Sequence, residues 1–443
     1  MKSKLLVIGI ILLFIGTAVF SSSGQTIGKT SVRGGHWLYV GGSGLENYTK
    51  IQDAINASSD GDTVFVYHGA YHEKLLIKKS IHLLGENKET TLINYEGHGI
   101  SYPVVNLSAD YIIFDNFSLN VTSGESECVA VYSASHCKIH NNTIFGTMWG
   151  IGVYHNSNMN EFYNNSFHTI SCALDLGDFS PNLCSGNVLH DNSFTNTGGS
   201  HHIYEAGLLL EQSAVNNTIS HNYFHDCTEY GILSLESKNN DIEHNTILGN
   251  TSKSQYGIGM KWSEEQAYIG NIIRENTIVD LAEGIYSETS GHTITGNAFE
   301  NDSYALDFSN GPINLIVKNN TIRGSVIGMD IWYAIGAVIE GNTFKKSKYG
   351  LVFDFCQNLT IKFNNFSGNT WAIAPETSSK NVISRNNFIG NTYFVLSFRS
   401  RNIWWKNYWD KPRFLPKLIL GLFPFTQFDW LPALKPYDIP GLT

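Results

Sequence analysis

Positive charge is scarce in this chain of 443 residues. It has 29 Lys and Arg against 39 Asp and Glu, which gives a formal net charge of −10. Binding to nucleic acid requires clustered positive charge, so this class of partner is excluded. Charged residues of either sign make up 15% of the chain and aromatic residues 13%. With so few charges available, Tyr and Trp side chains must form part of the surface.

Long hydrophobic runs are absent after the first 20 residues. The chain opens with Lys2 and Lys4, continues with the apolar run Leu5–Phe20, and then reaches Ser21–Gly24. This order is typical of a secretory signal peptide, here residues 1–24. An uncleaved anchor helix is the alternative, although the run is short for a membrane span. We therefore expect a secreted or cell-surface protein.

The usual sequence patterns of metal centres are also missing. The six cysteines include no Cys-x-x-Cys pair, and no predicted helix carries His-x-x-x-His. Because a copper or zinc site needs three or four convergent ligands, no cofactor is predicted, with copper or calcium as the alternative. Six cysteines in an exported chain permit disulfides, but their spacing aligns no pair. Buried free thiols are therefore favoured.

An eight-residue pattern recurs a dozen times along the chain. It reads Asn-x-apolar-x-x-Asn-x-apolar, as in Asn217–Phe224, and the last six steps between copies are 21 to 23 residues long. A fixed period of this length indicates one structural unit stacked many times. The second Asn is kept in every copy, at Asn142, Asn165, Asn192, Asn222, Asn245, Asn276, Asn297, Asn320, Asn342, Asn364, Asn386 and Asn407.

Each copy is predicted to hold two short strands joined by a bend, and a third strand after a Gly or Ala about eight residues later. Strands that stack on their counterparts one repeat away form three parallel sheets around an apolar interior. Asparagine suits the bend for two reasons: it tolerates left-handed backbone angles, and its amide can bond to the same Asn one coil away. The second property predicts an internal row of linked asparagines.

The two ends of the stack differ from the repeats. Tyr48–Ala57 is amphipathic, which predicts a helix with Thr49 and Gln52 as its capping pair. We assign residues 36–80 to an N-terminal cap and first coil, 81–409 to the repeats, and 410–443 to an aromatic, Pro-rich C-terminal cap. Such caps cover strand edges that would otherwise be unpaired. Contact of Leu415–Phe425 with a membrane surface is the alternative. We expect a monomer.

Several stretches resemble known families. Tyr48–Asn56, Gly61–Val64, Gly69–Tyr71 and Leu83–Glu86 resemble the N-terminal coil of pectin-lyase-like proteins, and the Asn repeats with the Asn407–Trp409 ending are similar to NosD-like repeat proteins. The resemblance covers nearly all of the mature chain and implies an all-β, right-handed three-sheet parallel β-helix. The fold hosts lyases, hydrolases, epimerases, esterases and non-catalytic adhesins, so it implies little about activity. The family name implies copper delivery, but the repeat carries no copper ligands.

A side chain that points out of a parallel sheet keeps its position on every coil, so the third strands can be aligned on their corner Gly or Ala. In this alignment Asp307 and Asp330 are neighbours about 5 Å apart, and Asp354 lies one coil on, roughly 8 Å from Asp330. Clustered carboxyl groups can supply acid and base for glycosidic cleavage, which makes these three the candidate catalytic residues. Pectin-degrading relatives carry acids on this face, although the Asn-Thr-Asp signature of polygalacturonases is absent. A solvated acidic face is the alternative.

Aromatic and polar residues flank these acids in the alignment. Two lengthened repeats add the loops Thr195–Glu205 and Thr251–Tyr256, which we expect to wall a groove that runs from Tyr154 to Asp354. The sequence therefore favours an exported protein that binds polysaccharide or glycosylated cell-surface material. A glycoside hydrolase, a polysaccharide lyase or epimerase, and a copper accessory protein are the alternatives. The candidate glycan-binding residues are Tyr154, His155, Asp175, Glu211, Lys261, Trp262, Tyr286, Glu288 and Trp332.

Overall fold

The computed structural model describes residues 35–95, 103–121, 127–146, 149–168, 171–195, 197, 205–250, 255–261, 269–419, 421 and 426–439. The predicted signal peptide, Trp262 and most of the two predicted loops lie outside these residues. Among the described residues, no helix is long and apolar enough to span a membrane.

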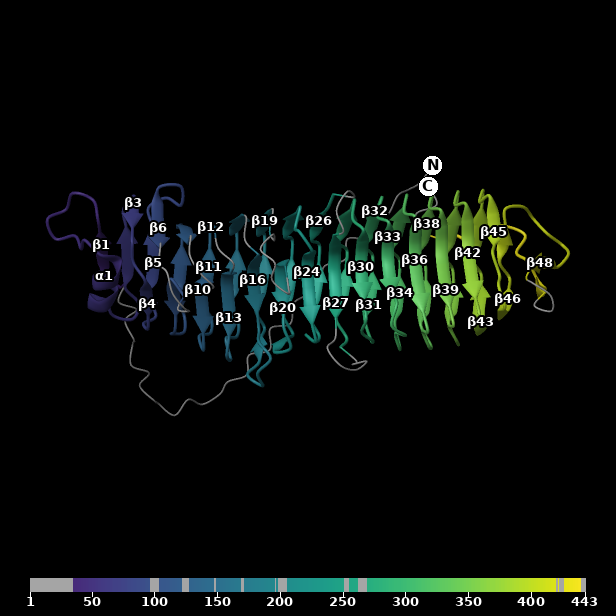
Figure 1. Cartoon of the computed structure of the whole chain (residues 1–443), viewed down its shortest axis with the longest axis horizontal. Coiled ribbons are helices and arrows are strands. Elements are labelled where there is room, and N and C mark those ends of the chain that lie inside the picture. The colour runs from purple at the N-terminus through teal and green to yellow at the C-terminus, as the bar shows by residue number, and fades with distance from the viewer. Residues whose placement is uncertain are drawn as a thin grey trace, which may run out of the picture. The chain divides into compact units, whose positions relative to one another are not determined.

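Three long sheets, A, B and C, account for nearly all the described strands. The chain visits them in turn, so each full coil adds one strand to each sheet, and neighbouring strands come from successive coils. Figure 1 shows these strands side by side in chain order, from β1 to β48. The predicted parallel β-helix with three sheets is confirmed.

Sheet A holds the first strand of each coil. Its 18 strands pair in parallel except for the final β48–β49 hairpin. They are β1 (Trp37–Val40), β2 (Thr63–Val66), β5 (His82–Gly85), β8 (Ile113–Asp115), β11 (Lys138–His140), β14 (Glu161–Tyr163), β18 (Val188–His190), β22 (Thr218–Ser220), β25 (Asp241–Glu243), β28 (Ile272–Arg274), β31 (Thr293–Thr295), β34 (Ile316–Lys318), β37 (Val338–Glu340), β40 (Thr360–Lys362), β43 (Ser379–Ser384), β46 (Arg401–Trp405), β48 (Lys417–Ile419) and β49 (Gln427–Asp429).

Sheet B holds the second strand of each coil and has 15 strands. They are β3 (Gly69–Tyr71), β6 (Thr91–Tyr95), β9 (Ser118–Val121), β12 (Thr143–Phe145), β15 (Ser166–His168), β19 (Ser193–Thr195), β23 (Tyr223–His225), β26 (Thr246–Leu248), β29 (Thr277–Val279), β32 (Ala298–Glu300), β35 (Thr321–Arg323), β38 (Thr343–Lys345), β41 (Asn365–Ser367), β44 (Asn387–Ile389) and β47 (Tyr408–Trp409).

Sheet C holds the third strand, whose outward side carries the predicted site, and has 14 strands. They are β4 (Leu75–Ile77), β7 (Val105–Leu107), β10 (Glu127–Tyr132), β13 (Trp149–Tyr154), β16 (Cys172–Leu176), β20 (Ala206–Leu210), β24 (Tyr230–Leu235), β27 (Tyr256–Lys261), β30 (Glu283–Ser287), β33 (Tyr304–Phe308), β36 (Ile327–Trp332), β39 (Tyr349–Asp354), β42 (Trp371–Glu376) and β45 (Tyr393–Val395). A separate pair joins β17 (Cys184–Ser185) to β21 (Ala214–Val215).

The interior is a set of stacked, matching side chains. The rings of Phe344, Phe366 and Phe388 lie nearly parallel, with centroids 4.9 and 5.2 Å apart, and Trp409 continues the stack at 4.4 Å. These spacings are close to the distance between neighbouring strands, so each coil presents the same face to the next. The six cysteines are buried thiols, as expected, and none is joined to another in a disulfide.

The second asparagines of the repeats form a continuous buried row, which we call the Asn ladder. Asn342 Nδ2 donates to Asn364 Oδ1 at 3.0 Å, and Asn342 Oδ1 accepts from the backbone N and Nδ2 of Asn320 at 2.9 and 3.0 Å. The predicted linkage of amides is confirmed. The predicted left-handed geometry is wrong for these residues, because the preceding residue makes the turn: Asn319 and Gly341 have φ of 54° and 71°.

The single helix among the described residues, α1 (Ile51–Ala57), buries Ile51, Ala54 and Ile55 as predicted, but its cap is different. Lys50 occupies the N-cap position without a side-chain bond, so the predicted Thr49 and Gln52 pair is wrong. The backbone N–H groups of Ile51 and Gln52 donate instead to the carboxylate of Glu73, at 2.8 and 3.1 Å. A carboxylate at this position also complements the positive end of the helix dipole.

At the other end, Asp429 from the β48–β49 hairpin terminates the Asn ladder. Its Oδ2 accepts from the backbone N and Nδ2 of Asn407 at 2.9 and 3.0 Å and from Trp409 Nε1 at 3.0 Å, and its Oδ1 accepts from Lys406 N at 3.0 Å. A carboxylate offers only acceptors. It therefore satisfies the last donors of the ladder without requiring another coil.

Candidate functional site on sheet C

The outward side of sheet C brings the three candidate catalytic aspartates together. Asp307 on β33 pairs in register with Asp330 on β36, which places their Cα atoms about 4.8 Å apart. Asp354 on β39 pairs in register with Trp332. It therefore lies on the strand after that of Asp330 and is displaced by two residues along the strand direction. The predicted register is confirmed, while the catalytic role of the three residues stays a prediction.

Burial makes these carboxyl groups hold their protons more tightly than usual. Burial, followed by the charge of Asp330, raises the pKa of Asp307 to about 6. Burial and the charge of Glu376 raise the pKa of Asp354 to about 7. The pKa of Asp330 is also raised by burial, against a hydrogen bond of 3.0 Å from Trp332 Nε1 to its Oδ1. Neighbouring acids with pKa values near neutrality can exchange protons with a bound hydroxyl group.

Glu283, on β30, extends this group toward the N-terminus. Burial and the charge of Asp307 raise the pKa of Glu283 to about 7, and the nearby Lys261 opposes the rise. The Lys261 ammonium lies 5.0 Å from the ring centroid of Tyr230 and 5.9 Å from that of Tyr286. We call Glu283, Asp307, Asp330 and Asp354 the C-terminal acidic group. Tyr286 adjoins this group, because it pairs in register with Asp307.

Glu288 lies at the edge of this group rather than within it. Tyr286 Oη donates to Glu288 Oε1 at 2.5 Å, which fixes both side chains beside Asp307. Burial, followed by the hydrogen bond to Glu288, raises the pKa of Tyr286. Tyr286 thus stays a neutral hydrogen-bond donor next to the acids.

Asp175, Glu211 and Tyr154 form a second acidic group, and Asp175 lies five strands from Asp307, about 24 Å at the usual strand spacing. Tyr154 Oη donates to Asp175 Oδ2 at 3.0 Å. Burial and the charge of Glu211 raise the pKa of Asp175 well above its ordinary value, and burial with the charge of Asp178 raises the pKa of Glu211 to about 7. We call this the N-terminal acidic group.

His155 follows β13 at the corner beside the N-terminal acidic group. Its Nε2 lies 3.5 Å from Asp178 Oδ2, and its ring packs against Tyr132 with centroids 4.5 Å apart. This places His155 at the rim, where it contacts the neighbours of the acids rather than the acids themselves.

Apolar side chains separate the two acidic groups on the described strands of sheet C, while the predicted groove from Tyr154 to Asp354 stays a prediction because most of its walling loops lie outside the described residues. Outward positions between them carry apolar side chains that form a separate buried cluster, with Leu209, Tyr230 and Leu233 at its centre. Both leucines are completely buried, because Leu side chains at outward positions pack on one another across adjacent strands. The predicted surface is therefore two acidic groups divided by an apolar centre.

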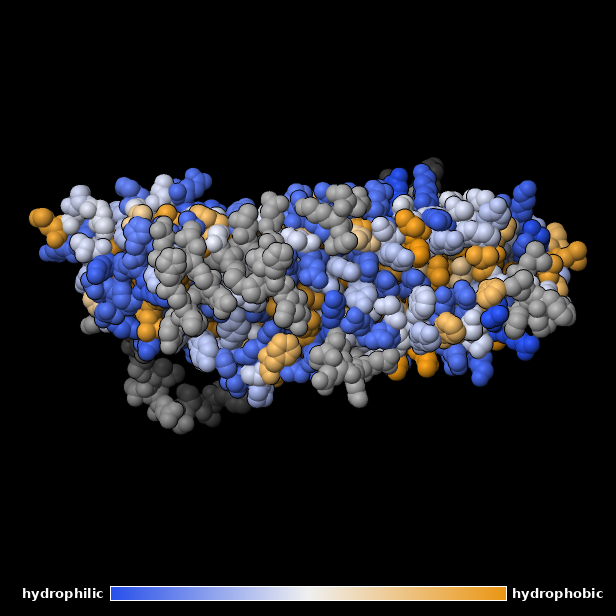
Figure 2. All heavy atoms as spheres, in the orientation of Figure 1, coloured by the Kyte–Doolittle hydropathy of each residue, from blue (hydrophilic) through white to orange (hydrophobic). Residues whose placement is uncertain are grey.

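An aromatic row that the sequence alignment did not assign borders the C-terminal acidic group. Tyr349 pairs with Trp371, and Trp371 pairs with Tyr393, while Tyr304 occupies the same position on β33. Each of these residues except Tyr393 directly precedes a corner Gly or Ala. That recurrence could have revealed the row. In Figure 2, hydrophobic and hydrophilic atoms alternate over the region that β33 to β42 occupy in Figure 1.

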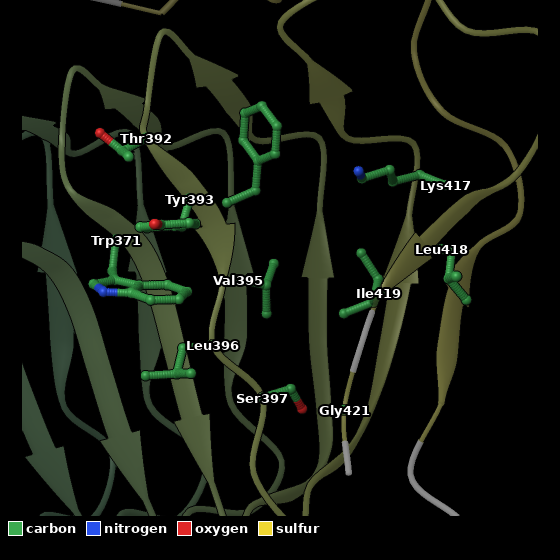
Figure 3. Close-up of a pocket in the computed structure, with 11 residues that line it drawn as sticks. Trp371, Thr392, Tyr393, Val395, Leu396, Ser397, Lys417, Leu418, Ile419 and Gly421 are labelled. Carbon is green, nitrogen blue, oxygen red and sulfur yellow. The ribbon is translucent and has the colours of Figure 1, made fainter. Parts of the chain in front are cut away.

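The aromatic row ends at a pocket of about 470 Å³ between β45 and β48. The rings of Trp371 and Tyr393 stack with centroids 4.2 Å apart, and Figure 3 shows Lys417 across the pocket from them. Burial, followed by the charge of Arg413, lowers the pKa of Lys417. The pocket thus offers an aromatic platform and one amine donor.

Comparison with known proteins agrees with the repeat pattern. The family model described as "Periplasmic copper-binding protein (NosD)" matches residues 180–310 and 270–421, which together cover more than half of the chain. The chain belongs to the NosD family. This membership agrees with the β-helix repeat, whereas the copper function in the family's description depends on which donor atoms the chain presents.

Individual relatives are more distant. A "Cell surface glycoprotein" of Methanothermus fervidus is 26% identical over 299 residues, which span 63% of this chain and 46% of that protein. The Dettilon tailspike protein is similar in structure, with a TM-score of 0.50 at 15% identity over 75% of this chain and 67% of that chain. A mannuronic acid specific polysaccharide lyase from human gut microbiota has a TM-score of 0.48 at 15% identity, covering 79% and 82%. The tailspike likeness concerns the fold alone, and the lyase likeness adds nothing to it.

The described residues do not fit a copper centre. No group of three His, Cys, Asp or Glu side chains among them is arranged to hold a metal ion. The thiols are buried, and burial raises the pKa of Cys356 to about 12 and that of Cys184 to about 11, which disfavours the thiolate that binds metal. His292 is also buried and bonds to Thr289, so it lies away from the surface.

Proposed function

We propose that this NosD-family protein is exported and binds polysaccharide or glycosylated cell-surface material on the outward side of sheet C. The observation that carries the proposal is the aromatic row beside the C-terminal acidic group. Aromatic rings stack on the apolar faces of sugars, and carboxyl groups accept hydrogen bonds from sugar hydroxyls. The acids supply these acceptors: Asp354 Oδ1 and Glu283 Oε2 have no hydrogen-bond donor among the described residues.

Affinity electrophoresis against a panel of soluble polysaccharides tests this proposal. At least one polymer should retard the protein, and Tyr393→Ala should weaken that binding about fivefold, in line with a lost stacking contact of ~1 kcal/mol. Tyr223→Ala is the matched control, because Tyr223 is 40% exposed on sheet B and Tyr393 50% exposed on sheet C. Equal effects of the two substitutions, or no retardation by any polymer, would refute binding at this face.

A second candidate function is glycosidic cleavage by the C-terminal acidic group. The in-register pairing of Asp307 with Asp330 supports it, because residues on neighbouring strands can bring their carboxyl groups to the separation of about 5 Å that retaining hydrolases use. Release of reducing ends from the retained polymer measures cleavage. Asp330→Asn should abolish release while leaving retardation in place; release that persists in Asp330→Asn rules out this role for Asp330.

A further inference from the structure

We infer that the outward side of sheet C selects glycans that carry free amino groups and excludes polyuronates. This inference rests on the proposed glycan binding and specifies the ligand. The first observation is the charge balance of the described strands of sheet C, which hold one cationic side chain, Lys261. Their carboxyl groups number seven and belong to Glu127, Asp175, Glu283, Asp307, Asp330, Asp354 and Glu376.

The second observation is that two of the acids each carry a carboxyl oxygen without a donor. Asp354 is 8% exposed and Asp175 is 5% exposed, and the Oδ1 atom of each accepts no hydrogen bond from the described residues. A buried acceptor without a partner is costly, so a ligand that brings donors stabilises it. An ammonium group brings three donors and a positive charge. A uronate would instead add a further negative charge to each group.

The third observation is that ammonium groups already lie over aromatic rings of this face, since Lys348 Nζ, just before β39, lies 5.5 Å from the ring centroid of Tyr349. Lys261 Nζ lies over the rings of Tyr230 and Tyr286 and close enough to Glu283 to affect its titration. An amino sugar combines the same elements, an ammonium group and an apolar ring face. Lys261 therefore serves as an internal example of the chemistry that Asp307, Asp330 and Asp354, two to four strands further along the sheet, are arranged to receive.

The row of aromatic residues explains why the ligand is a sugar rather than a simple polyamine. Tyr304 and Tyr349 lie two strands apart on β33 and β39, on either side of β36, and Trp371 continues the row on β42. These rings sit at one end of strands whose other end carries Asp354. A glycan that lies along the strand direction would contact rings and acids together, whereas a flexible polyamine would use the acids alone.

Isothermal titration calorimetry with three hexasaccharides tests the inference. They are the glucosamine hexamer with free amines, its fully N-acetylated form, and the galacturonate hexamer. We expect the glucosamine hexamer to bind at least tenfold more tightly than the N-acetylated form, and the galacturonate hexamer to show no binding. Equal affinity of the first two, or binding of the galacturonate hexamer, would overturn the selectivity and leave glycan binding in place. Failure of all three, together with failure of the polysaccharide panel, would instead refute the proposed function.

A pair of charge-matched variants separates this site from the net charge of the protein. Asp307→Asn with Asp330→Asn should weaken binding of the glucosamine hexamer at least tenfold. Asp280 directly follows β29 and Glu300 lies in β32, both on sheet B. Asp280→Asn with Glu300→Gln removes the same charge there and should leave binding unchanged. An equal loss in both variants would show attraction by net charge and overturn the inference. If the first variant does not give the wild-type circular dichroism spectrum, Asp354→Asn takes its place.

Discussion

Replacing Asn342 by Ala removes one link of the Asn ladder and measures how much the ladder contributes to stability. Asn342 is completely buried, and its Oδ1 accepts both the backbone N–H and the Nδ2–H of Asn320. Alanine leaves these two donors without that oxygen in a place that water does not reach. A buried donor without an acceptor costs about 1–3 kcal/mol, so we expect the free energy of unfolding to fall by about 3 kcal/mol.

Urea unfolding followed by far-UV circular dichroism provides the assay. Asn319→Gly is the matched control, because Asn319 is an exposed neighbour with φ of 54°, and the next coil has Gly341 at the equivalent position. Glycine adopts this backbone conformation without strain, so the control should lie within about 0.5 kcal/mol of the wild type. If Asn342→Ala also lies within that range, the ladder is a consequence of the coil rather than a source of its stability.

Three further substitutions test the acids and the two ends. The pKa of Asp354 is about 7 in the folded protein and roughly 3.9 in the unfolded chain, so between these pH values the folded state binds more protons. Asp354 therefore contributes stability at low pH, and this contribution is lost as the pH rises toward 7. Asp354→Asn should remove this dependence, and urea midpoints at pH 5 and 7.5 that shift equally in both proteins would contradict it. Asp429→Ala removes the acceptor of four donors on Lys406, Asn407 and Trp409, and it should lower the free energy of unfolding by about 3 kcal/mol. A loss below about 0.5 kcal/mol would mean that another group accepts these hydrogen bonds. Glu73→Ala should cost about 1 kcal/mol and speed hydrogen exchange at the amides of Ile51 and Gln52, and unchanged exchange there would exclude Glu73 as the cap.

The repeat and the register of the acids could be predicted from the sequence because the period is short and marked. Each second Asn fixes the phase of its coil, and the strand that follows begins at a nearly constant distance. For this reason the spacing alone predicts that Asp307 and Asp330 lie side by side, as they do. The same reasoning predicted that the asparagines bond to one another, as Asn342 and Asn364 do.

Features that depend on more than the period were not predictable in this way. Alternation indicates that Leu209 and Leu233 point outward, but not that they bury one another and divide the surface. The carboxylate of Glu73 reaches α1 from a position 22 residues away, so local capping rules favoured Thr49 instead. Asparagine is suited both to left-handed backbone angles and to side-chain amide bonds, so the sequence predicts both for the ladder Asn. In the structure the ladder Asn makes the amide bonds, and the residue before it adopts the left-handed angles.

The arrangement at Asp429 implies that the number of coils can change without loss of register. Every interior link of the Asn ladder joins identical groups, and only the last link ends on a carboxylate. Deletion of the 22 residues from 343 to 364 would bring Asn342 against Asn386, the same pairing that Asn364 now makes. Insertion of a coil would extend the aromatic and acidic face of sheet C by one strand. Duplication or deletion of whole coils can therefore lengthen or shorten this face one strand at a time. The β48–β49 hairpin would end the ladder in the same way in each case.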